Sequence, residues 1–487
     1  MNILLASSEV FPFCKTGGLA DVAGALAQVF SRTKDSEVAV FLPRYRNIGG
    51  GNFSLKALPG TFNIPIAGRV EKASLSYVEW GKVKVYFVQN SKYFDRAELY
   101  KTKAGDFSDN DERFTFFARA VLEGAKFAGF KPDVIHCNDW QTALIPAYLK
   151  TLYSIDAFFA RTATALTIHN IAFQGIFPKS SYFKAGFGWP DYTPDKMEYY
   201  NGFNFLKAGI VYADLISTVS PTYCSEIKQS SEKGRGLEGV LAARAGDCVG
   251  ILNGIDTELW DPEWDSYLPR GYDNRSFLKG KFLARQLLCK EAGLEFKPDV
   301  PAVGMVSRLD YQKGVDIIIK TVESYVSRLQ FFFIGTGNPA MEAELEALAA
   351  KYPQAVSYRN AHDEAWAHKI YGGADLFLMP SRFEPCGLSQ LIAMRYGALP
   401  IVSRTGGLVD TVRGYGVDSE PDGFLLERID ESALADSLAL ALTLYKDEKK
   451  WSALVKNAMS RDSSWDLSAG KYFELFGKAL AKVRNSV

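Results

Sequence analysis

Short apolar runs alternate with helix-like stretches along almost the whole chain. Each run is rich in Val, Ile, Leu, Phe or Ala and ends in polar or glycine-rich residues. Because the runs are apolar almost throughout, rather than at every second position, they favour parallel strands covered on both faces. We predict strands at 2–7, 37–43, 83–89, 133–139, 163–169 and 215–220 and, after a break, at 301–307, 329–335, 355–360, 375–381 and 398–404.

Helical segments separate these strands, for example at 112–130, 341–352 and 432–446. Alternation of this kind predicts an α/β protein with two doubly wound, Rossmann-like units. A chain of 487 residues suits two or three domains. We predict a first domain at 1–250 and a second at 251–465, with a last helix at 466–487 that packs back on the first domain.

Polar and glycine-rich segments follow many of the predicted strands. In the first half these are "CKTGG", "NDW" and "HN"; in the second half they are "SRLDYQKG", "SRFEPCGL" and "RTGGL". Ligands of open parallel sheets bind beyond the carboxyl ends of the strands. The alignment therefore predicts two sheets that face one another across a ligand-binding cleft.

The composition is that of an ordinary globular protein, with 47% apolar and 23% charged residues. Lys and Arg together number 56, as do Asp and Glu, so no net field attracts nucleic acid or an anionic membrane. Six scattered cysteines without a CxxC pair are typical of free thiols in a reducing compartment. The start "MNILLASSEV" has no basic region, and no apolar run approaches the roughly 18 residues of a membrane span. We expect a cytoplasmic protein.

Two loops carry cations that could neutralise an anionic ligand. Lys15 precedes Gly17 and Gly18 at the start of an Ala-rich helix, where bare backbone N–H groups could approach a phosphate. A tight turn with a solvated lysine explains this loop equally well. Arg308 and Lys313 share one loop after a buried strand, and as a pair they favour diphosphate binding over solvated side chains. No GxGxxG follows a strand, so a dehydrogenase is excluded.

The segment "SRFEPCGLSQ" places Glu384 after a strand, where a carboxylate suits two ribose hydroxyls. The backbone N–H groups of Gly387 and Leu388 would then face phosphate. The alternative is a helix cap, which contributes about 1 kcal/mol. Cys386 is better explained as a small packed residue than as a nucleophile.

Asp139 and His169 follow two neighbouring strands, and we expect His169 to touch a substrate. His136, within its strand, is better explained as a buried, hydrogen-bonded histidine. Asn253 lies at the presumed hinge, where turn chemistry alone accounts for it. Four histidines without ligand spacing give no metal site, and no metal or other cofactor is predicted.

Taken in order, seven segments resemble the bacterial glycogen synthases and plant starch synthases, which are retaining, ADP-glucose-dependent glucosyltransferases of GT-B architecture. The resemblance runs end to end. It rests on "KTGGLADV", "HCNDWQTALIP", "TIHNIAFQG", "NGIDTELWDP", "SRLDYQKG", "SRFEPCGLSQLIAMRYG" and "RTGGLVDTV". Under this resemblance the near-identical loops at 16–22 and 405–411 are opposing lips of one cleft. Many other retaining GT-B enzymes carry a second glutamate where this chain has Ile392, so no role is taken from it.

The resemblance implies transfer of glucose from ADP-glucose to glycogen or a malto-oligosaccharide, without a metal. Arg308 and Lys313, with Lys15 and the amides of Gly18, Gly387 and Leu388, would hold the diphosphate, and Glu384 the ribose or sugar. Further residues are expected around the sugar and acceptor: Glu9, Asp21, Asp139, His169 and Asn253; Thr405 and Gly406 are expected to bind substrate. Aromatic residues at 93–100 mildly favour a polymer, through stacking on sugar rings. The alternatives are a UDP-glucose-dependent glucosyltransferase, a sugar-nucleotide epimerase and a non-catalytic glucan-binding protein.

Overall fold

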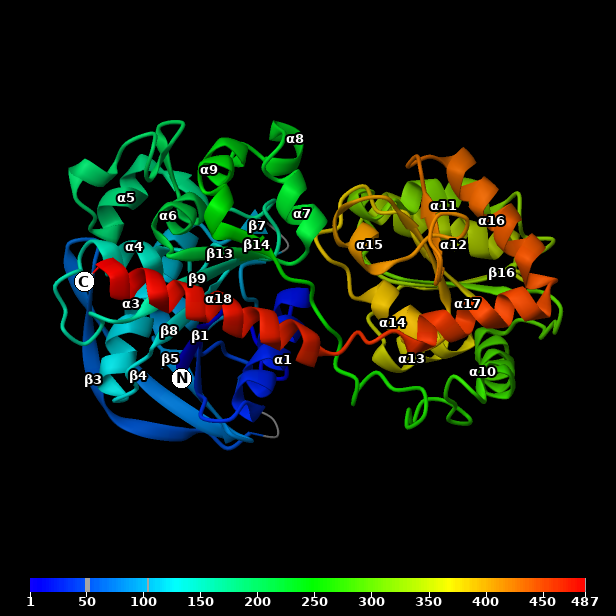
Figure 1. The fold of residues 1–487 in the computed structure, drawn as a ribbon, viewed down its shortest axis with the longest axis horizontal. Coiled ribbons are helices and arrows are strands. Elements are labelled where there is room, and N and C mark those ends of the chain that lie inside the picture. The colour runs from blue at the N-terminus through cyan, green and yellow to red at the C-terminus, as the bar shows by residue number, and fades with distance from the viewer. Residues whose placement is uncertain (49–52, 103–104, 487) are drawn as a thin grey trace. The chain divides into compact units, whose positions relative to one another are not determined.

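The computed structural model describes residues 1–48, 53–102 and 105–486, which form two compact units (Figure 1). The first unit comprises Met1–Asn253 and the C-terminal segment that begins at Trp465. The second unit comprises Gly254–Ser464. Val487, the last residue of the helix predicted at 466–487, lies outside the described residues.

The main sheet of the first unit has the strand order β14-β13-β9-β8-β1-β2-β5-β4-β3 in the described ranges. Its strands from β14 to β5 run parallel, whereas β4 runs antiparallel to both β5 and β3. The strands are β1 (Asn2–Ala6), β2 (Glu37–Pro43), β3 (Lys56–Ile66), β4 (Arg69–Trp80), β5 (Val83–Gln89), β8 (Val134–Asn138), β9 (Ala163–Ile168), β13 (Leu215–Thr218) and β14 (Cys248–Gly250). All six strands predicted here are confirmed; the β3–β4 hairpin was not predicted.

Small sheets and helices complete this unit. The short strands are β6 (Lys101–Thr102), β7 (Gly105–Asp106), β10 (Ile176–Pro178), β11 (Glu198–Tyr199) and β12 (Gly202–Asn204). The helices are α1 (Gly18–Arg32), α2 (Ser91–Phe94), α3 (Asn110–Phe127), α4 (Leu144–Lys150), α5 (Lys179–Ala185), η1 (Trp189–Asp191), α6 (Phe205–Tyr212), α7 (Pro221–Glu226), α8 (Ser231–Gly234), α9 (Glu238–Ala243), η2 (Ala245–Asp247) and α18 (Trp465–Ser486).

The last helix, α18, packs on the first unit although the whole second unit precedes it in the chain (Figure 1). The ring of Phe30 in α1 contacts those of Tyr472 and Phe476 in α18, with centroids 5.8 and 5.4 Å apart. The Ser468 hydroxyl donates to the Leu252 carbonyl. These contacts bury an aromatic cluster against His136, whose Nε2 lies 2.7 Å from Thr167 Oγ1. His136 is therefore the buried, hydrogen-bonded residue that we expected.

The second unit is built on a parallel sheet with the order β17-β16-β15-β18-β19-β20. Its strands are β15 (Ala302–Val306), β16 (Gln330–Ile334), β17 (Val356–Arg359), β18 (Leu376–Met379), β19 (Leu399–Ser403) and β20 (Phe424–Leu426). Its helices are α10 (Phe277–Ala292), η3 (Tyr311–Lys313), α11 (Val315–Val322), α12 (Pro339–Lys351), α13 (Glu364–Gly373), α14 (Ser389–Arg395), α15 (Gly406–Thr411), α16 (Glu431–Tyr445) and α17 (Glu448–Ser460). The five strands predicted here are confirmed, and β20 is additional.

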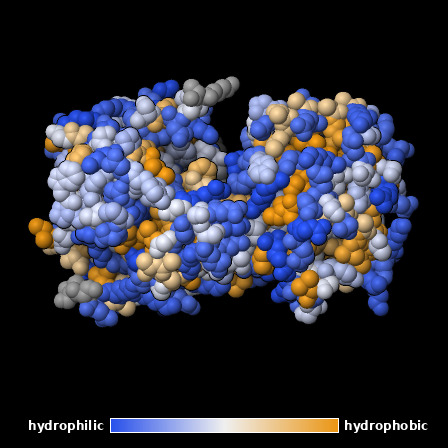
Figure 2. Space-filling view, turned by 90° about the horizontal axis from the view of Figure 1, so that it is seen from above, coloured by the Kyte–Doolittle hydropathy of each residue, from blue (hydrophilic) through white to orange (hydrophobic). Residues whose placement is uncertain are grey.

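Hydrophobic and hydrophilic side chains are both present at the surface. On the face shown in Figure 2, hydrophobic residues form small patches among hydrophilic ones. No helix in the described ranges is both long enough and apolar enough to cross a membrane.

Candidate active site

The loop between β1 and α1 is organised around the carboxylate of Glu9, which is almost fully buried. Its Oε2 accepts hydrogen bonds from the backbone N–H groups of Thr16, at 2.5 Å, and Gly17, at 3.2 Å. Its Oε1 accepts from the hydroxyls of Thr16 and Tyr100, each at 2.9 Å. Burial raises the pKa of Glu9, although these donors oppose the shift. The amide of Gly17, expected to face a phosphate, is therefore occupied by Glu9.

Lys15 lies beside this cluster and is half exposed. Its Nζ is 2.7 Å from Asp21 Oδ1, in the first turn of α1, and 5.6 Å from the centre of the Phe11 ring. An exposed ion pair of this kind contributes little stability, about 0–1 kcal/mol, so the lysine can exchange its partner at small cost. The turn and the anion-binding explanation of Lys15 are both compatible with this geometry.

Asp139 and His169 meet at the ends of the neighbouring strands β8 and β9. Asp139, with φ at 56°, directs Oδ1 to the backbone N–H of His169 at 2.7 Å. The His169 Nε2 lies 2.9 Å from Asn138 Oδ1. Because Asn138 Nδ2 donates to the Ala6 carbonyl at 3.0 Å, its amide oxygen faces the histidine, and Nε2 carries the ring proton. Asn138 thereby fixes the tautomer, a role that the sequence analysis did not assign.

The electrostatics of this pair follow from burial. Burial lowers the pKa of His169 to about 3, so the ring is neutral. Its Nδ1 is buried and has no partner, which leaves a lone pair that can accept a hydrogen bond from a hydroxyl. Burial, together with the nearby charge of Glu9, raises the pKa of Asp139 to about 7. The pair combines a neutral acceptor with a carboxyl that titrates near neutrality.

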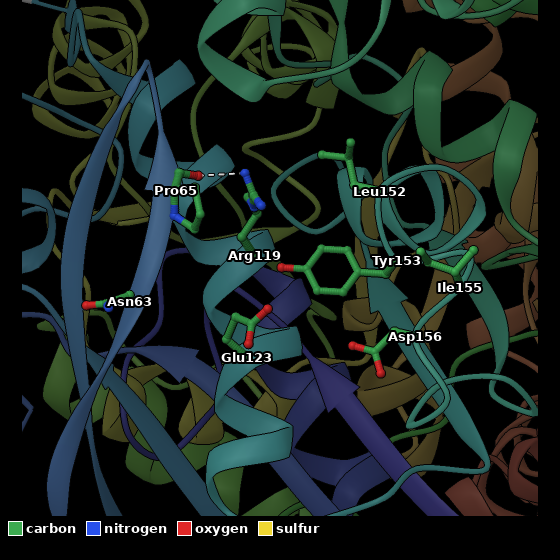
Figure 3. A pocket seen from close by; sticks show the side chains of 8 residues that line it. All are labelled: Asn63, Pro65, Arg119, Glu123, Leu152, Tyr153, Ile155 and Asp156. Carbon is green, nitrogen blue, oxygen red and sulfur yellow. Dashed lines mark hydrogen bonds between the residues drawn. The ribbon is translucent and has the colours of Figure 1, made fainter.

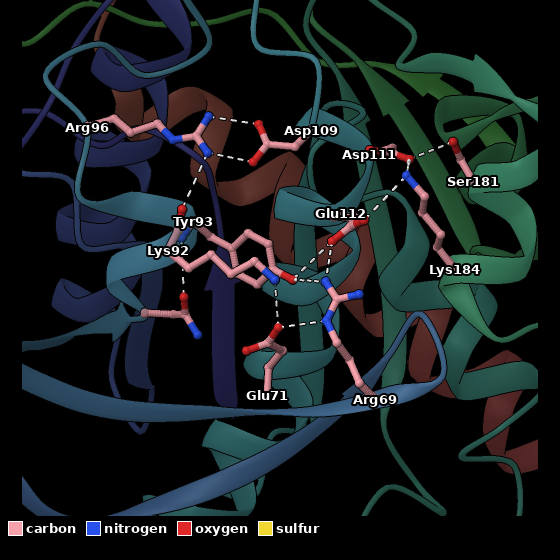
Figure 4. Close-up of polar contacts among 11 residues, drawn as sticks. Arg69, Glu71, Lys92, Tyr93, Arg96, Asp109, Asp111, Glu112, Ser181 and Lys184 are labelled. Carbon is pink, nitrogen blue, oxygen red and sulfur yellow. Dashed lines mark hydrogen bonds and ion pairs between the residues drawn. The ribbon is translucent and has the colours of Figure 1, made fainter.

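The segment 93–100 does not offer the predicted aromatic platform, because Tyr93 and Phe94 are fully buried. Figure 4 shows the polar network that holds this segment. Arg69 donates to the Tyr93 hydroxyl at 3.1 Å and also pairs with Glu112. The rings of Tyr93 and Phe94 pack in the core and are held there by this network. The prediction that they stack on sugar rings is therefore wrong. Tyr100, at the end of the segment, directs its hydroxyl to Glu9, and Asn110 Nδ2 donates to the Tyr100 carbonyl at 3.0 Å.

In the second unit, Lys313 and Glu384 form the centre of the candidate site. Lys313 Nζ lies 2.6 Å from Glu384 Oε2, which also accepts from the Ser381 hydroxyl at 3.1 Å. The two loops are tied further, because Gln312 Nε2 donates to the Phe383 carbonyl at 2.8 Å. Both charged side chains are largely buried. Glu384 is therefore not a helix cap, and that alternative is wrong; α14 begins after Leu388 without a side-chain cap.

The loop before α15 packs directly on the Glu384 loop. Gly407 N–H donates to the carbonyls of Glu384 and Pro385, both at 3.1 Å. Gly406 has φ at 47°, and a Cβ there would lie 2.1 Å from the Glu384 carbonyl oxygen, so a side chain does not fit. Thr405, the residue before α15, is buried. The two TGG loops are held in a similar way, by a glutamate that follows a strand. In the first loop the carboxylate of Glu9 accepts a hydrogen bond from the N–H of Gly17. In the second loop the backbone carbonyl of Glu384 accepts one from the N–H of Gly407.

Gly387 and Leu388 complete this part of the site, and Gln390 supports them. Gln390 is fully buried, and its Nε2 donates to the carbonyls of Cys386 and Gly387 and to the Thr411 hydroxyl, each at 3.0 Å. No role was predicted for this glutamine. Cys386 is buried, as expected of a packed residue.

Arg308 is exposed, whereas Asn253 is buried. The Arg308 side chain is 56% exposed and lies 3.3 Å from Asp310. Asp310 also accepts from the backbone N–H of Lys313, so one carboxylate orients both cations of the loop. Asn253 ends the first unit and is buried, with Oδ1 unpartnered. Turn geometry alone does not explain why this buried oxygen has no hydrogen-bond partner.

The predicted residues thus gather into two groups. In the first unit they follow β1, β8 and β9, which are neighbours in the sheet, with Asn253 after β14. In the second unit they follow β15, β18 and β19, again three neighbours. The members of the second group are Arg308, Lys313, Glu384, Gly387, Leu388, Thr405 and Gly406. Each sheet presents its group at the carboxyl ends of its parallel strands, where ligands of this fold bind.

Two cavities lie apart from these residues. One of about 490 Å³ is bounded by α3, β3 and the segment after α4, with Arg119 donating to the Pro65 carbonyl at its edge (Figure 3). Another of about 310 Å³ lies in the second unit and is lined by residues that include Arg395 and Arg461. Neither contains a predicted site residue. Within the described ranges, no group of three or more His, Cys, Asp or Glu side chains is arranged to hold a metal ion.

Similarity to known proteins covers the chain from end to end. The family described as "Starch synthase catalytic domain" matches residues 2–243, and "Glycosyl transferases group 1" matches residues 290–458. The glycogen synthase of Elusimicrobium minutum is 53% identical over 99% of this chain and 100% of its own length. The glycogen synthase of Thermotoga petrophila is 43% identical over 99% of this chain and 100% of its own length.

Solved structures agree in fold. The catalytic domain of starch synthase IV from Arabidopsis thaliana, bound to ADP and acarbose, superposes with a TM-score of 0.90 at 34% identity, covering 99% of each chain. A sucrose-phosphate synthase from Thermosynechococcus elongatus, 18% identical with a TM-score of 0.62, shares the fold. The GT-B fold class predicted from sequence is therefore confirmed. The chain belongs to the glycogen and starch synthase family of glycosyltransferases.

Proposed function

We propose that this protein transfers glucose from ADP-glucose to the non-reducing end of an α-1,4-glucan, with retention of configuration and release of ADP. The observation that carries the proposal is the buried Lys313–Glu384 pair at the ends of adjacent strands, in a chain whose relatives are named glycogen synthases. The ADP and acarbose bound to the Arabidopsis relative are a nucleoside diphosphate and a glucan-like ligand, which supports this donor and acceptor.

The second unit is assigned to the donor. Arg308 and Lys313, oriented by Asp310, would neutralise the diphosphate, and the amides of Gly387 and Leu388 would add hydrogen bonds to its oxygens. Glu384 would accept from hydroxyls of the ribose or the transferred glucose while Lys313 holds its carboxylate in place. Thr405 and Gly406 support the backbone of this loop, because the segment around them packs on Glu384.

The first unit is assigned to the transferred sugar and the acceptor. The unpartnered Nδ1 of His169 and the unpartnered Oδ1 of Asn253 are buried acceptors of the kind that sugar hydroxyls satisfy. Asp139 fixes the His169 backbone and supplies a carboxyl near the same ring. Lys15, held beside Asp21 and the Glu9-braced loop that leads into Gly18, would supply a further cation to the phosphate oxygens.

Retention follows from attack on the face that the leaving group vacates. The bond between the anomeric carbon and the diphosphate oxygen breaks, and the acceptor 4-hydroxyl oxygen forms the new bond to that carbon. The hydroxyl proton passes to the departing phosphate oxygen, so ADP leaves with its charge partly compensated. Arg308 and Lys313 stabilise the charge that develops on this oxygen, which is where fixed cations lower the barrier most.

Nucleoside diphosphate release tests the proposal, measured with ADP-glucose and UDP-glucose, each with and without glycogen. The proposal expects ADP release that depends on glycogen. A preference for UDP-glucose would reject the donor assignment, and isomerisation of the donor without glycogen would identify an epimerase. No release from either donor, with glycogen still bound, would identify a glucan-binding protein.

A further inference from the structure

Two cysteines that lie apart in the sequence meet in the first unit. Cys224 in α7 and Cys248 in β14 are separated by 24 positions, and their Sγ atoms lie 3.3 Å apart. Figure 1 shows α7 and β14 beside each other. All six cysteines carry free thiols. The sulfurs need to approach by only about 1.3 Å to reach the S–S bond length of about 2.05 Å.

The surroundings distinguish the two thiols. Lys228 Nζ lies 3.5 Å from Cys224 Sγ, one turn further along the chain. Hydrogen bonding from Cys248, with the charge of Lys228, lowers the pKa of Cys224, whereas the adjacent Cys224 raises the pKa of Cys248. Because Lys228 lies beside Cys224, Cys224 is the thiol of the pair that loses its proton more readily. Cys248 is partly exposed, whereas Cys224 is buried.

Three of the other cysteines, Cys14, Cys137 and Cys289, have thiols of raised pKa. Cys14 is also partly exposed, but burial of its thiol raises its pKa to about 12. Burial raises the pKa of Cys137 and Cys289 as well. Because the thiolate is the reactive form, oxidants react selectively with the cysteine of lowest pKa that they reach.

We propose that Cys224 and Cys248 are an oxidation site at which a peroxide closes a reversible intramolecular disulfide. The Cys224 thiolate attacks one peroxide oxygen, the O–O bond breaks, and sulfenic acid forms at Cys224 while hydroxide leaves. The Cys248 sulfur then attacks Cys224 Sγ and displaces the sulfenic oxygen, which departs as water with the Cys248 proton. In sum, two thiols and one hydrogen peroxide give one disulfide and two waters.

Hydrogen bonds and chain connections link the elements that carry this cysteine pair to segments of the candidate site. Tyr223, next to Cys224, accepts a hydrogen bond at its hydroxyl from the backbone N–H of Ile171 at 2.8 Å, two residues after His169. On the other side, β14 leads into Asn253, and Ile251 N–H donates to the Thr218 carbonyl. α7 and β14 are therefore connected to the segments that carry His169 and Asn253. The oxidation site itself does not depend on which donor or acceptor the protein uses.

The test maps thiols after brief treatment of the reduced, full-length protein with hydrogen peroxide, followed by alkylation and peptide mass spectrometry. We expect a peptide linked through Cys224 and Cys248 to form at least tenfold faster than oxidation of Cys14, and to disappear with dithiothreitol. Oxidation of Cys14 at an equal rate, or absence of the linked peptide, would overturn the proposal.

Variants assign the two roles. In Cys248→Ser we expect the sulfenic acid to persist at Cys224, where dimedone labels it, whereas Cys224→Ser should leave Cys248 unlabelled. Lys228→Met should slow the reaction several-fold and Lys228→Arg should preserve its rate. Labelling of Cys248 in the Cys224→Ser variant, at the wild-type rate, would reverse the roles and contradict the account.

Discussion

Lys313 and Glu384 are 71 positions apart in the sequence, yet their side chains meet at 2.6 Å where β15 and β18 end side by side. Ser381 donates to the same carboxylate oxygen, and the loop residues around the pair are linked by backbone hydrogen bonds. A charged pair that is largely withdrawn from water costs desolvation, so its presence at a strand end indicates use in binding or catalysis rather than in stability.

Replacing Lys313 tests that use. We expect Lys313→Ala to lower kcat by about 100- to 1,000-fold, the usual cost of removing one group that stabilises charge in the transition state. The KM for glycogen should change little, because the role proposed for this lysine is on the leaving diphosphate. Steady-state kinetics with varied glycogen measures both.

Lys320→Ala is the matched control, since Lys320 is an exposed lysine of the same unit that pairs with Glu431. It should leave kcat unchanged. A Lys313→Ala variant with normal kcat and a raised KM for glycogen would place the lysine on the acceptor instead.

Gly406 tests the packing between the two loops of the second unit. Its Cβ would overlap the Glu384 carbonyl oxygen, and its φ of 47° disfavours a side chain. We expect Gly406→Ala to reduce the free energy of unfolding by about 2–3 kcal/mol and to lower turnover by displacing Glu384. Denaturant unfolding followed by circular dichroism gives the stability change. Gly416→Ala, with φ at 82° and open space around it, should cost only about 1 kcal/mol; equal losses would show that the close approach is unimportant.

Glu9 tests the brace of the first loop. Glu9→Gln keeps one accepting oxygen but turns an N–H₂ group towards donors, so we expect a loss of about 1–3 kcal/mol in the free energy of unfolding. Turnover should also fall, because Lys15 and Gly18 lose their support. The exposed Glu98→Gln carries the same change without effect on either quantity. A Glu9→Gln variant as stable and as active as wild type would show that the brace is dispensable.

Asp139 predicts a pH dependence of stability. Its pKa of about 7 in the folded protein exceeds its ordinary value of 3.8, so between these values the folded state binds a proton that the unfolded state lacks. The free energy of unfolding therefore falls as pH rises from about 4 to 7, with a slope of up to about 1.4 kcal/mol per pH unit from this group. Asp139→Asn removes this contribution and should gain stability relative to wild type as pH rises.

The comparison is made by unfolding wild type and variant at pH 5 and pH 8. His136 and His169, with pKa values lowered to about 3, act in the opposite direction below pH 6.5 and cancel in the difference between the two proteins. Asp436→Asn, at an exposed position, is the matched control. A constant offset between wild type and Asp139→Asn would mean that Asp139 does not titrate in this range.

The fully buried strands could be predicted because a run such as that of β18 is apolar at every position. The β3–β4 hairpin could not, since exposed and partly buried residues make up most of β3 and blur its pattern. Residues at strand ends were predictable because parallel topology places them at one edge. Tyr100, Asn138 and Gln390 act through hydrogen bonds to other site residues, which no local sequence pattern encodes. The contact between Cys224 and Cys248 was likewise hidden, because it depends on how α7 packs on β14.

The most direct test of the account is to incubate the enzyme with ADP-glucose and a short malto-oligosaccharide and to resolve the products by chain length and anomeric configuration. The account predicts a ladder that grows by single glucose units through α-1,4 bonds, with one ADP released for each unit added. Conversion of ADP-glucose to ADP and free glucose, or to an isomeric sugar nucleotide, with the oligosaccharide unchanged, would contradict it.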